Sequence, residues 1–391
     1  MLMYPLLLAG RAWSYCKPLP PAYRVYFFFP FYHTGGAEKV HTQVAQGQGG
    51  SDCIVYFTRK SADKRFYNDF VASECVIKDI SLWCDNKLLY FLNIFYRGFI
   101  SAQINRQKQP CVVFNGQCNF AYKISPWIKA GIKQVELSHS FNTFSWIRLP
   151  FLPFIDTTVM ISKQRVQDHY AQYKRLQVPG AFAQKISYIV NGIPLPQIVP
   201  PKNIDGDITI LYVGRGTTEK RVHLVARMAE KVHLSKLPVT FVFLGEVKQA
   251  IPAHLLPFCT LLGNKENVAE INEAYASANV VIITSFTEGF PMVIEEGMAW
   301  GCSIMATPVG DIPYHVHHLE NGFLFSTIGT EEVIVKEGVD FIQHLCHNRQ
   351  LLIEMGANNT TYAYATFGIK NFNLRYKQIL QPNQPNQPNQ L

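Results

Sequence analysis

Two glutamates in the stretch 284–301 stand where they could bind the sugar parts of a phosphorylated ligand. The apolar run 280–284 predicts a buried strand before them, and Pro291 suits the first turn of a following helix, where its missing N–H would be unsatisfied anyway. A helix N-terminus at the carboxyl end of a parallel strand offers free amides to an anion. Glu288 precedes this terminus, and Glu296 lies about a turn and a half inside the helix. We therefore expect phosphate at the amides, sugar hydroxyls on Glu288 and ribose hydroxyls on Glu296.

The residues between these glutamates complete the predicted donor-binding loop. Gly289 would let the backbone approach a ligand, because glycine has no Cβ. Phe290, Pro291 and Met292 would form the rest of the loop. Glu295 is expected to be a solvated neighbour of Glu296. An ordinary helix start with solvated carboxylates is the alternative interpretation.

A second glycine-containing turn, 214–216, follows the apolar run 208–213 and is accompanied by cations. Arg215 and Lys220 would place two positive charges on a diphosphate, which neutralises a departing nucleoside diphosphate without a metal. No GxGxxG fingerprint of a dinucleotide site is present in the sequence. Two surface cations at a helix start are the alternative.

The first half of the chain contributes weaker candidates. Gly35 and Gly36 open a helix predicted over 37–45, where backbone amides could face the same diphosphate; a tight turn with positive φ is the alternative. His139 follows a predicted strand and could hydrogen-bond the donor sugar or position the acceptor. A loop histidine without function is the competing interpretation.

No metal or other cofactor is expected. The pair Asp205 and Asp207 resembles the Asp-x-Asp of metal-dependent sugar transferases, but it precedes a predicted strand and is interpreted as a turn. His315, His317 and His318 lie close together in sequence without a supporting cysteine or carboxylate cluster.

Short apolar runs alternate with helical patterns along the chain, which predicts parallel sheets covered by helices. The strands predicted in the first half cover residues 23–29, 53–57, 111–114, 135–137, 158–161 and 186–190. Those in the second half cover 208–213, 239–244, 259–262, 280–284 and 303–306, with helices near 220–233, 266–276 and 291–300. The expected fold class is α/β, with two Rossmann-like doubly wound domains facing a central cleft.

Composition changes mark the expected boundaries of these domains. Turn formers and prolines over 191–201 predict a linker, and Pro at every third residue near the C-terminus cannot continue a helix. The predicted parts are an N-terminal lead-in without periodicity (1–22), an acceptor domain (23–190), the linker (191–201), a donor-binding domain (202–361), a terminal helix (362–380) and a disordered Gln-Pro-Asn tail (381–391).

Composition and charge also limit the partners. The 391 residues are 48% hydrophobic, yet no apolar run reaches the roughly 18 residues of a spanning helix, and the start of the chain lacks the features of a secretory signal. Nine cysteines without a Cys-x-x-Cys spacing favour reduced thiols and a cytoplasmic location. Residues 1–195 hold 22 Lys and Arg against 10 Asp and Glu, whereas residues 196–391 hold 14 against 18.

The basic first half predicts an anionic partner. We expect it to hold a glycan or lipid-linked acceptor, with peripheral contact to an anionic membrane at its inner face. A solvated basic surface without a partner is the alternative. No recognisable nucleic-acid-binding module is present in the sequence, so no nucleic-acid partner is expected.

In combination, these motifs resemble family 4 of the retaining glycosyltransferases, which have the GT-B fold. The resemblance extends from about residue 23 to 380. It rests on Gly-Gly-Ala-Glu-Lys-Val (35–40), Asn-Gly-Ile (191–193), Val-Gly-Arg with Glu-Lys (213–215 and 219–220), Glu-x7-Glu (288–296), Gly-Cys-Ser-Ile-Met-Ala-Thr (301–307) and Glu-Asn-Gly-Phe-Leu (320–324).

The resemblance implies roles for single residues. Arg215 and Lys220 would hold the donor diphosphate, Glu288 the transferred sugar, Glu296 the ribose, and His139 would line the donor-sugar pocket. The resemblance also implies that the last helix returns to the N-terminal domain. The acceptor would attack on the face that the diphosphate leaves, and the leaving phosphate would take the acceptor proton.

The chain departs from the family pattern at four positions. Arg221 stands where the family commonly has Gly, Asp311 replaces the second Gly of a usual pair, and Tyr314 and His315 occupy a region where Glu is common.

We therefore predict a retaining, metal-independent hexosyltransferase that acts in the assembly of a cell-surface glycan such as lipopolysaccharide or capsule. The alternative is a non-catalytic nucleotide-sugar-binding protein of the same fold. A Rossmann oxidoreductase is disfavoured, because the acidic ribose residue after the first strand is missing as well as the glycine fingerprint.

Overall fold

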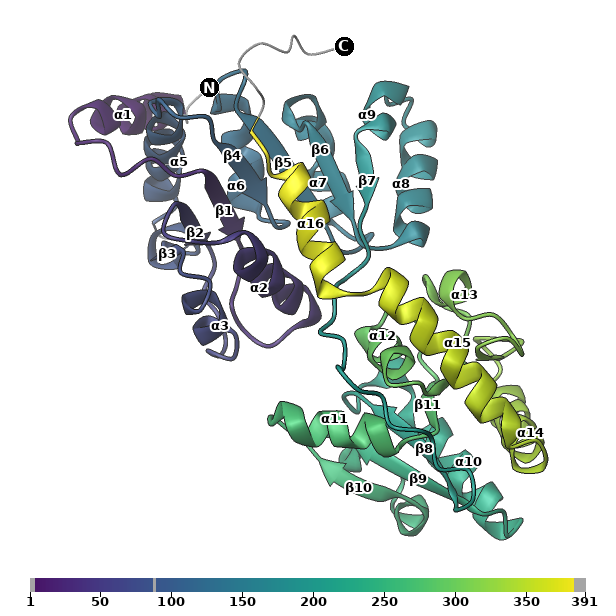
Figure 1. Cartoon of the computed structure of the whole chain (residues 1–391). Helices are drawn as coiled ribbons and strands as arrows, with labels where there is room; N and C mark the ends of the chain where they lie inside the picture. Colours follow the sequence, from purple (N-terminus) through teal and green to yellow (C-terminus); the bar gives the residue numbers. More distant parts are fainter. Residues whose placement is uncertain (1–3, 87–88, 383–391) are drawn as a thin grey trace. The chain divides into compact units, whose positions relative to one another are not determined.

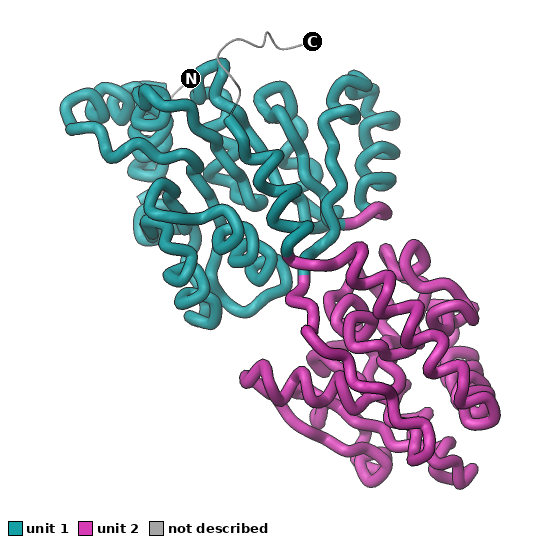
Figure 2. Tube along the Cα trace, in the orientation of Figure 1, with its two compact units in different colours: residues 1–161, 165–192, 370–391 teal, residues 162–164, 193–369 magenta. Residues whose placement is uncertain are grey.

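A computed structural model describes residues 4–86 and 89–382, which form two compact α/β units (Figure 1). Unit 1 comprises residues 1–161, 165–192 and 370–391, and unit 2 comprises residues 162–164 and 193–369 (Figure 2). Most of the predicted Gln-Pro-Asn tail, residues 383–391, lies outside the described residues.

Unit 1 is built on a parallel sheet of seven strands in the order β3-β2-β1-β4-β5-β6-β7. The strands are β1 (Val25–Phe29), β2 (Cys53–Phe57), β3 (Val76–Asp79), β4 (Val112–Asn115), β5 (Lys133–Ser138), β6 (Thr157–Met160) and β7 (Ile186–Tyr188).

Helices cover both faces of this sheet. They are α1 (Tyr4–Tyr15), α2 (Gly36–Gln48), α3 (Tyr67–Val71), α4 (Ser81–Cys84), α5 (Tyr90–Asn105), α6 (Asn119–Ile124), α7 (Phe144–Ile147), α8 (Lys163–Arg175), α9 (Gly180–Gln184) and α16 (Ile369–Ile379), with short 3₁₀ helices at Ser125–Trp127 and Leu149–Phe154.

The central strand β1 explains why both faces need covering. All five of its residues are buried, which is the apolar run expected of a parallel strand between two helical layers. Tyr26 and Phe28 pack in the cluster that contains residues of α5 and α6. On the opposite face, Phe29 stacks on His41 of α2 at a ring-centroid distance of 4.4 Å.

The lead-in predicted over 1–22 is wrong in one respect, because Tyr4–Tyr15 form the helix α1. This helix lies against α5 (Figure 1). Two glycines allow the contact: a Cβ on Gly10 would lie 2.0 Å from the Phe95 carbonyl oxygen, and one on Gly98 would lie 1.9 Å from that of Leu7. The run carries apolar residues around most of the helix, so it lacks the periodicity that signals an amphipathic helix.

Unit 2 contains a second parallel sheet, with the order β10-β9-β8-β11-β12-β13. Its strands are β8 (Ile208–Val213), β9 (Val239–Leu244), β10 (Thr260–Gly263), β11 (Val280–Ile283), β12 (Ser303–Ala306) and β13 (Gly322–Leu324). Its helices are α10 (Val222–Leu234), α11 (Val268–Ser277), α12 (Met292–Ala299), α13 (Ile312–His315), α14 (Glu331–His347) and α15 (Gln350–Thr366), with 3₁₀ helices at Thr218–Lys220, Lys248–Ala250 and Ala253–Phe258.

The terminal helix predicted over 362–380 is interrupted. The chain leaves α15 after Thr366 and enters α16 at Ile369, and Gly368 between them forms a bridge with Ile193. Within unit 1, α16 packs on the sheet through Tyr376, whose ring lies 6.3 Å from that of Phe114. The Asn373 carbonyl accepts a hydrogen bond from Gln48 of α2 at 2.7 Å. The local pattern predicts one helix, but the pairing of Gly368 with Ile193 separates it into α15 and α16.

All eleven predicted strands are present, within two residues at each end. Two further strands, β3 and β13, were not predicted as strands from local pattern. Only two of the four residues of β3 are even half-buried, and β13 has three residues. Such short edge strands have little apolar signal, so their pairing with β2 and β12 decides their structure.

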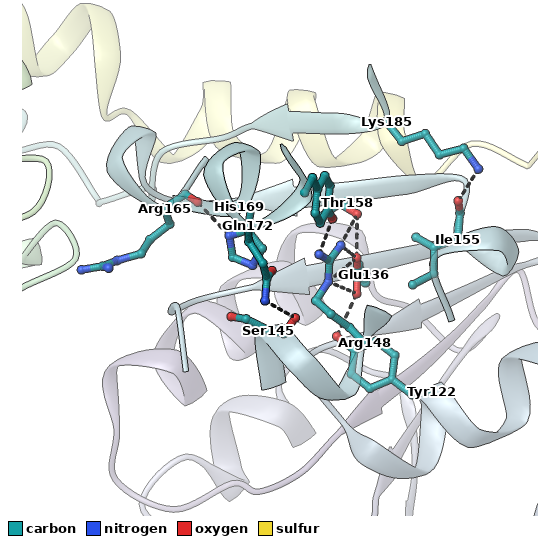
Figure 3. Close-up of polar contacts among 11 residues, drawn as sticks. Tyr122, Glu136, Ser145, Arg148, Ile155, Thr158, Arg165, His169, Gln172 and Lys185 are labelled. Carbon is teal, nitrogen blue, oxygen red and sulfur yellow. Dashed lines mark hydrogen bonds and ion pairs between the residues drawn. The ribbon is translucent and has the colours of Figure 1, made fainter. Parts of the chain in front are cut away.

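A buried ion pair and its hydrogen bonds join four elements of unit 1: β5, β6, α6 and the end of α7 (Figure 3). Glu136 on β5 and Arg148 after α7 have fully buried side chains. Glu136 also accepts hydrogen bonds from Tyr122 at 2.8 Å and from Thr158 at 2.6 Å. Burial alone would raise the pKa of Glu136, but the Arg148 charge and these hydrogen bonds lower it below its ordinary value. The pair therefore holds β5, and the loop that follows it, in place.

Replacing Arg148 with Met should lower the free energy of unfolding of unit 1 by about 3–5 kcal/mol, because Glu136 would remain as an uncompensated buried charge. Arg165→Met is the matched control, since it removes a partly exposed ion pair with Asp168 and should cost no more than about 1 kcal/mol. Urea unfolding measures both. Equal losses in the two variants would contradict the role assigned to Arg148.

Candidate functional site

The candidate donor site of unit 2 lies where its strand order reverses. β8 and β11 are neighbours and run parallel, so the loops that follow them emerge at the same edge of the sheet. The first loop carries Arg215 and Lys220, and the second carries Glu288. Such a reversal leaves a crevice at the carboxyl ends of the strands, which is where open α/β sheets bind ligands.

Lys220 and Glu288 meet at this edge. The Lys220 ammonium lies 2.5 Å from Glu288 Oε1, and the two side chains are 25% and 10% exposed. The two residues are 68 positions apart in the sequence, and the pairing of β8 with β11 brings them together. The structure therefore brings together a cation and a carboxylate that the sequence analysis assigned to one ligand.

Glu296 is held separately, inside α12. The hydroxyl of Tyr275, at the end of α11, donates a hydrogen bond to Glu296 Oε2 at 2.7 Å. Burial and the Glu296 charge raise the pKa of Tyr275 well above its ordinary value, so it remains a hydrogen-bond donor. Tyr275 fixes one oxygen of the carboxylate and was not found by sequence analysis.

The expectation that Glu295 is solvated is wrong. Glu295 of α12 is fully buried, whereas Glu296 is half-buried. The helix lies close to the sheet because Gly297 has no side chain: a Cβ there would lie 2.8 Å from Val281 Cγ2. Successive helix residues point about 100° apart, so adjacent glutamates cannot share one environment.

Arg221 ties the two loops together. It has a left-handed backbone, with φ of +49°, which accounts for Gly being common at this position in the family that the chain resembles. Its guanidinium donates hydrogen bonds to the carbonyls of Thr284 at 2.8 Å and Ile328 at 2.7 Å. The backbone N–H of Phe286 donates to the Glu219 carbonyl at 2.8 Å. The departure at 221 thus adds hydrogen bonds beneath the site.

The segment 308–315 supports the far side of the Glu288 loop. Gly310 has φ of +57°, and a Cβ there would lie 2.1 Å from the Gly289 carbonyl oxygen. The Asp311 N–H donates to that same oxygen at 2.7 Å. His315 stacks on Phe290 with a ring-centroid distance of 4.2 Å. The departures at Asp311 and His315 are therefore packed against the donor loop.

The remaining predicted residues of unit 2 surround this edge. Pro291 is the N-cap and Met292 the first residue of α12, so the proline lies one position before the helix. Gly289 faces open space at the position of a Cβ. Arg215 is exposed in its loop, and Tyr212 donates a hydrogen bond to its carbonyl at 3.0 Å.

In unit 1, Gly35 and Gly36 stand at the start of α2. Gly35 is extended, with φ of −178°, and neither glycine has positive φ, which removes the tight-turn alternative. A Cβ at Gly36 would meet nothing within 4 Å, whereas one at Gly35 would lie 2.1 Å from Glu38 Oε2. Glu38 is buried, and this burial raises its pKa. The helix start is open on the side of Gly36.

His139 is paired with His41 of α2. Their Nε2 atoms lie 2.8 Å apart, so the N–H of one neutral ring donates a hydrogen bond to the Nε2 of the other. Both Nδ1 atoms are buried without a hydrogen-bond partner among the described residues. Burial lowers the pKa of His139 to about 4 and that of His41 well below its ordinary value. Sequence analysis missed His41, whose position in α2 carries no signal of the contact.

Within residues 4–86 and 89–382, no three His, Cys, Asp or Glu side chains are arranged as ligands for a metal ion. His315 is occupied by its stack on Phe290 and by a 2.8 Å hydrogen bond with Tyr362. None of the helices in the described part of the chain combines the length and apolar character that crossing a bilayer requires.

Comparison with known proteins bears on unit 2 first. Residues 207–339 match the family model described as glycosyl transferases group 1. This segment is therefore similar to a group 1 glycosyltransferase domain. The sulfoquinovosyl transferase SQD2 of Arabidopsis thaliana is 26% identical over 171 residues, which are 41% of this chain and 32% of that protein. The chain spans about a third of the length of the curated relatives that it matches.

Solved structures match nearly the whole chain. HepE of Anabaena, in complex with UDP and glucose, superposes with a TM-score of 0.68 at 16% identity, covering 92% of this chain and 99% of that one. The lipopolysaccharide outer core galactosyltransferase WaaB gives a TM-score of 0.64 at 18% identity, covering 91% and 98%. The chain therefore has the GT-B fold, with two Rossmann-like domains.

The buried histidine pair should make unit 1 less stable at acidic pH. Unfolded imidazoles take up protons below about pH 6.5, whereas folded His139 does so only near pH 4, so stability is complete above this window and is lost as pH falls through it. Lowering the pH from 7 to 5 should cost about 2 kcal/mol for one such histidine. Urea unfolding of His139→Gln should show a correspondingly smaller loss.

His347→Gln is the control for this measurement, because His347 is exposed at the end of α14. It should retain the pH dependence of the unmodified chain. An unchanged pH dependence in His139→Gln would show that His139 is not held neutral by its surroundings.

Proposed function

We propose that the protein is a retaining hexosyltransferase of the family 4 type, which transfers a sugar from a nucleotide diphosphate sugar to an acceptor hydroxyl. The observation that carries the proposal is the ion pair of Lys220 and Glu288 at the carboxyl ends of β8 and β11. The cation suits the diphosphate of such a donor, and the adjacent carboxylate suits the hydroxyls of its sugar. HepE, which shares the fold, is described in complex with UDP and with UDP-glucose.

The roles within the site follow from charge and position. Lys220 and the exposed Arg215 would neutralise the diphosphate, and amides of residues 289–292 would contact the phosphate and the sugar. Glu288 would accept hydrogen bonds from hydroxyls of the transferred sugar. Glu296, oriented by Tyr275, would accept hydrogen bonds from the ribose hydroxyls.

The transfer itself needs little chemistry from the protein. The acceptor oxygen forms a bond to the anomeric carbon as the bond from that carbon to the diphosphate oxygen breaks, and the electron pair of that bond leaves with the diphosphate. The leaving diphosphate takes the acceptor proton. If the acceptor attacks on the face that the diphosphate leaves, the anomeric configuration is retained. Lys220 and Arg215 then stabilise charge that develops on the leaving group.

In unit 1 the proposal assigns supporting roles. The open start of α2 at Gly35 and Gly36 would offer amides to the donor phosphate. His139 would contact the donor sugar as a neutral ring, because its lowered pKa keeps it uncharged near neutral pH. No metal ion is required by this scheme, since two cationic side chains serve the diphosphate.

We place the reaction in the assembly of a cell-surface glycan, at the inner face of a membrane. WaaB, a lipopolysaccharide galactosyltransferase, shares the fold over most of the chain. The surplus of 22 basic over 10 acidic residues in residues 1–195 suits an anionic acceptor or lipid surface.

The donor can be identified by thermal shift with UDP-, GDP- and ADP-sugars, because a ligand at 100 times its Kd stabilises the folded chain by about 2.7 kcal/mol. With that donor and an acceptor extract, Lys220→Ala and Arg215→Ala should each lower kcat/KM by about 10²–10³, or about 2.7–4 kcal/mol in the barrier. Release of nucleoside diphosphate measures the reaction.

Lys231→Ala is the matched control, since Lys231 is an exposed lysine of α10 in the same unit. Its kcat/KM should be unchanged. Normal transfer by the Arg215→Ala, Lys220→Ala double variant would contradict the assignment of these two residues to the donor diphosphate. A donor that binds without any transfer would favour the non-catalytic nucleotide-sugar-binding protein.

The stereochemistry and the metal dependence are tested on the product. Proton NMR of the first product formed should show the anomeric configuration of the donor, and chelation by EDTA should leave the rate unchanged. Inversion would exclude same-face attack, and loss of activity that Mg²⁺ or Mn²⁺ restores would show that a metal assists the leaving group.

A further inference from the structure

Unit 1 contains a basic cavity at the carboxyl ends of three of its strands. It has a volume of about 290 Å³ and is lined by Pro30, Thr58 and Gln117, which follow β1, β2 and β4. β1 and β4 are the neighbours between which the strand order of this sheet reverses. The cavity therefore occupies the position at which open α/β sheets bind ligands. The donor-binding residues proposed in unit 2 do not account for this cavity in unit 1.

The charges of the basic cavity favour an anion. Arg59, Arg97 and Lys123 line it, and Asp85 is the one carboxylate among the lining residues that the structure describes. Asp85 Oδ1 lies 3.5 Å from Arg59 Nε, and Asp85 Oδ2 accepts a hydrogen bond from the Lys60 N–H at 3.1 Å. The lining thus has two positive charges in excess, which suits a phosphate dianion.

Gln117 adds a neutral donor to the lining. Its backbone has φ of +58°, an uncommon conformation for a residue with a side chain. Its Nε2 is buried and has no hydrogen-bond partner among the described residues, while its Oε1 accepts from the His139 N–H at 3.4 Å. A donor left unsatisfied in this way is costly unless a ligand accepts from it.

An apolar groove of about 300 Å³ shares two residues with the basic cavity. Arg97 and Lys123 line both spaces. The rest of the groove consists of Tyr4, Leu7, Ile94, Pro126, Trp127 and Phe151. The cations therefore stand at the junction of a polar space and an apolar one.

The outer face of α1, beside this groove, is apolar and aromatic. On this face Tyr4, Leu8 and Tyr15 are each more than half exposed, while Trp13, about half exposed, lies on the other side of the helix. Cations accompany these rings: Lys17 lies 5.0 Å from the Trp13 ring centroid, and Arg106 lies 4.8 Å from that of Tyr15. Aromatic residues with adjacent Lys and Arg are the composition of helices that lie in a membrane surface.

We propose that the basic cavity and the apolar groove together bind a lipid phosphate, with its phosphate on Arg59, Arg97, Lys123 and Gln117 and its chain in the groove beside α1. The inference rests on the proposed function, in which this ligand is the acceptor or the anchor of the acceptor. A soluble sugar phosphate would leave the groove unused, and a neutral lipid would not match the net positive charge of the cavity lining. The shared Arg97 and Lys123 place the two parts of one amphiphile in contact.

The test measures binding without donor, so it is independent of transfer. The probes are decyl phosphate, decanol and inorganic phosphate in calorimetric titrations of the full chain. Decyl phosphate should bind at least about tenfold more tightly than either of the others, because only it fills both spaces. If decanol bound as tightly as decyl phosphate, the basic cavity would not be a phosphate site. If inorganic phosphate bound as tightly as decyl phosphate, the groove would not bind the alkyl chain.

Two pairs of variants separate the spaces. Lys123→Gln should weaken decyl phosphate about tenfold, whereas Lys129→Gln, at an exposed lysine that lines neither space, should not. Tyr4→Ser and Trp127→Ala should each weaken decyl phosphate but not inorganic phosphate. Circular dichroism and urea unfolding show whether each variant is folded. No difference between Lys123→Gln and Lys129→Gln would overturn the assignment.

Two further arms fix the source of the phosphate and the link to the donor. Flotation with phosphatidylcholine vesicles should retain the chain only when the vesicles carry decyl phosphate, and Lys123→Gln should reduce this retention. Displacement of decyl phosphate by free UDP would overturn the proposal, since the cavity would then be a nucleotide site. If decyl phosphate bound but none of the nucleotide sugars did, the proposed function would be contradicted and the lipid phosphate site would still be supported.

Discussion

Both sheets reverse their strand order beside the first strand of their unit, and this reversal is the constraint on which both sites depend. β1 has β2 on one side and β4 on the other, and β8 has β9 and β11. Chains that leave two such neighbours must turn away to opposite sides, so a space remains between the following loops. The Lys220–Glu288 pair occupies that position in unit 2, and the basic cavity occupies it in unit 1.

Buried polar groups hold these loops in place. Arg221 donates to carbonyls of the strand end at 284 and of the loop at 328, and Tyr275 orients Glu296. In unit 1 the Glu136–Arg148 pair fixes β5 immediately before His139. These groups are away from the ligand positions, yet they decide which atoms a ligand meets. A buried ion pair or arginine is costly to desolvate, so its full set of partners gives the local structure one preferred arrangement.

The predicted site divides into residues that local pattern supports and residues that it does not. Glu288 and Lys220 could be chosen because each follows an apolar strand and precedes a helix, and the parallel pairing of β8 and β11 brings them together. Glu295 was misjudged as solvated, because the sequence does not show how closely α12 approaches the sheet at Gly297. His41 and Tyr275 have no signal of their own, since each acts through a partner far away in the chain.

The sequence by itself determined the alternation of strands and helices, the two-unit α/β plan and the candidate donor residues, because apolar period and turn chemistry are local properties. Only the tertiary structure decided that the N-terminal segment is a helix against α5, that the last helix breaks at Gly368, and that Arg97 and Lys123 join a polar cavity to an apolar groove. Each of these depends on which distant segments lie together, and residue spacing along a chain contains no record of that packing.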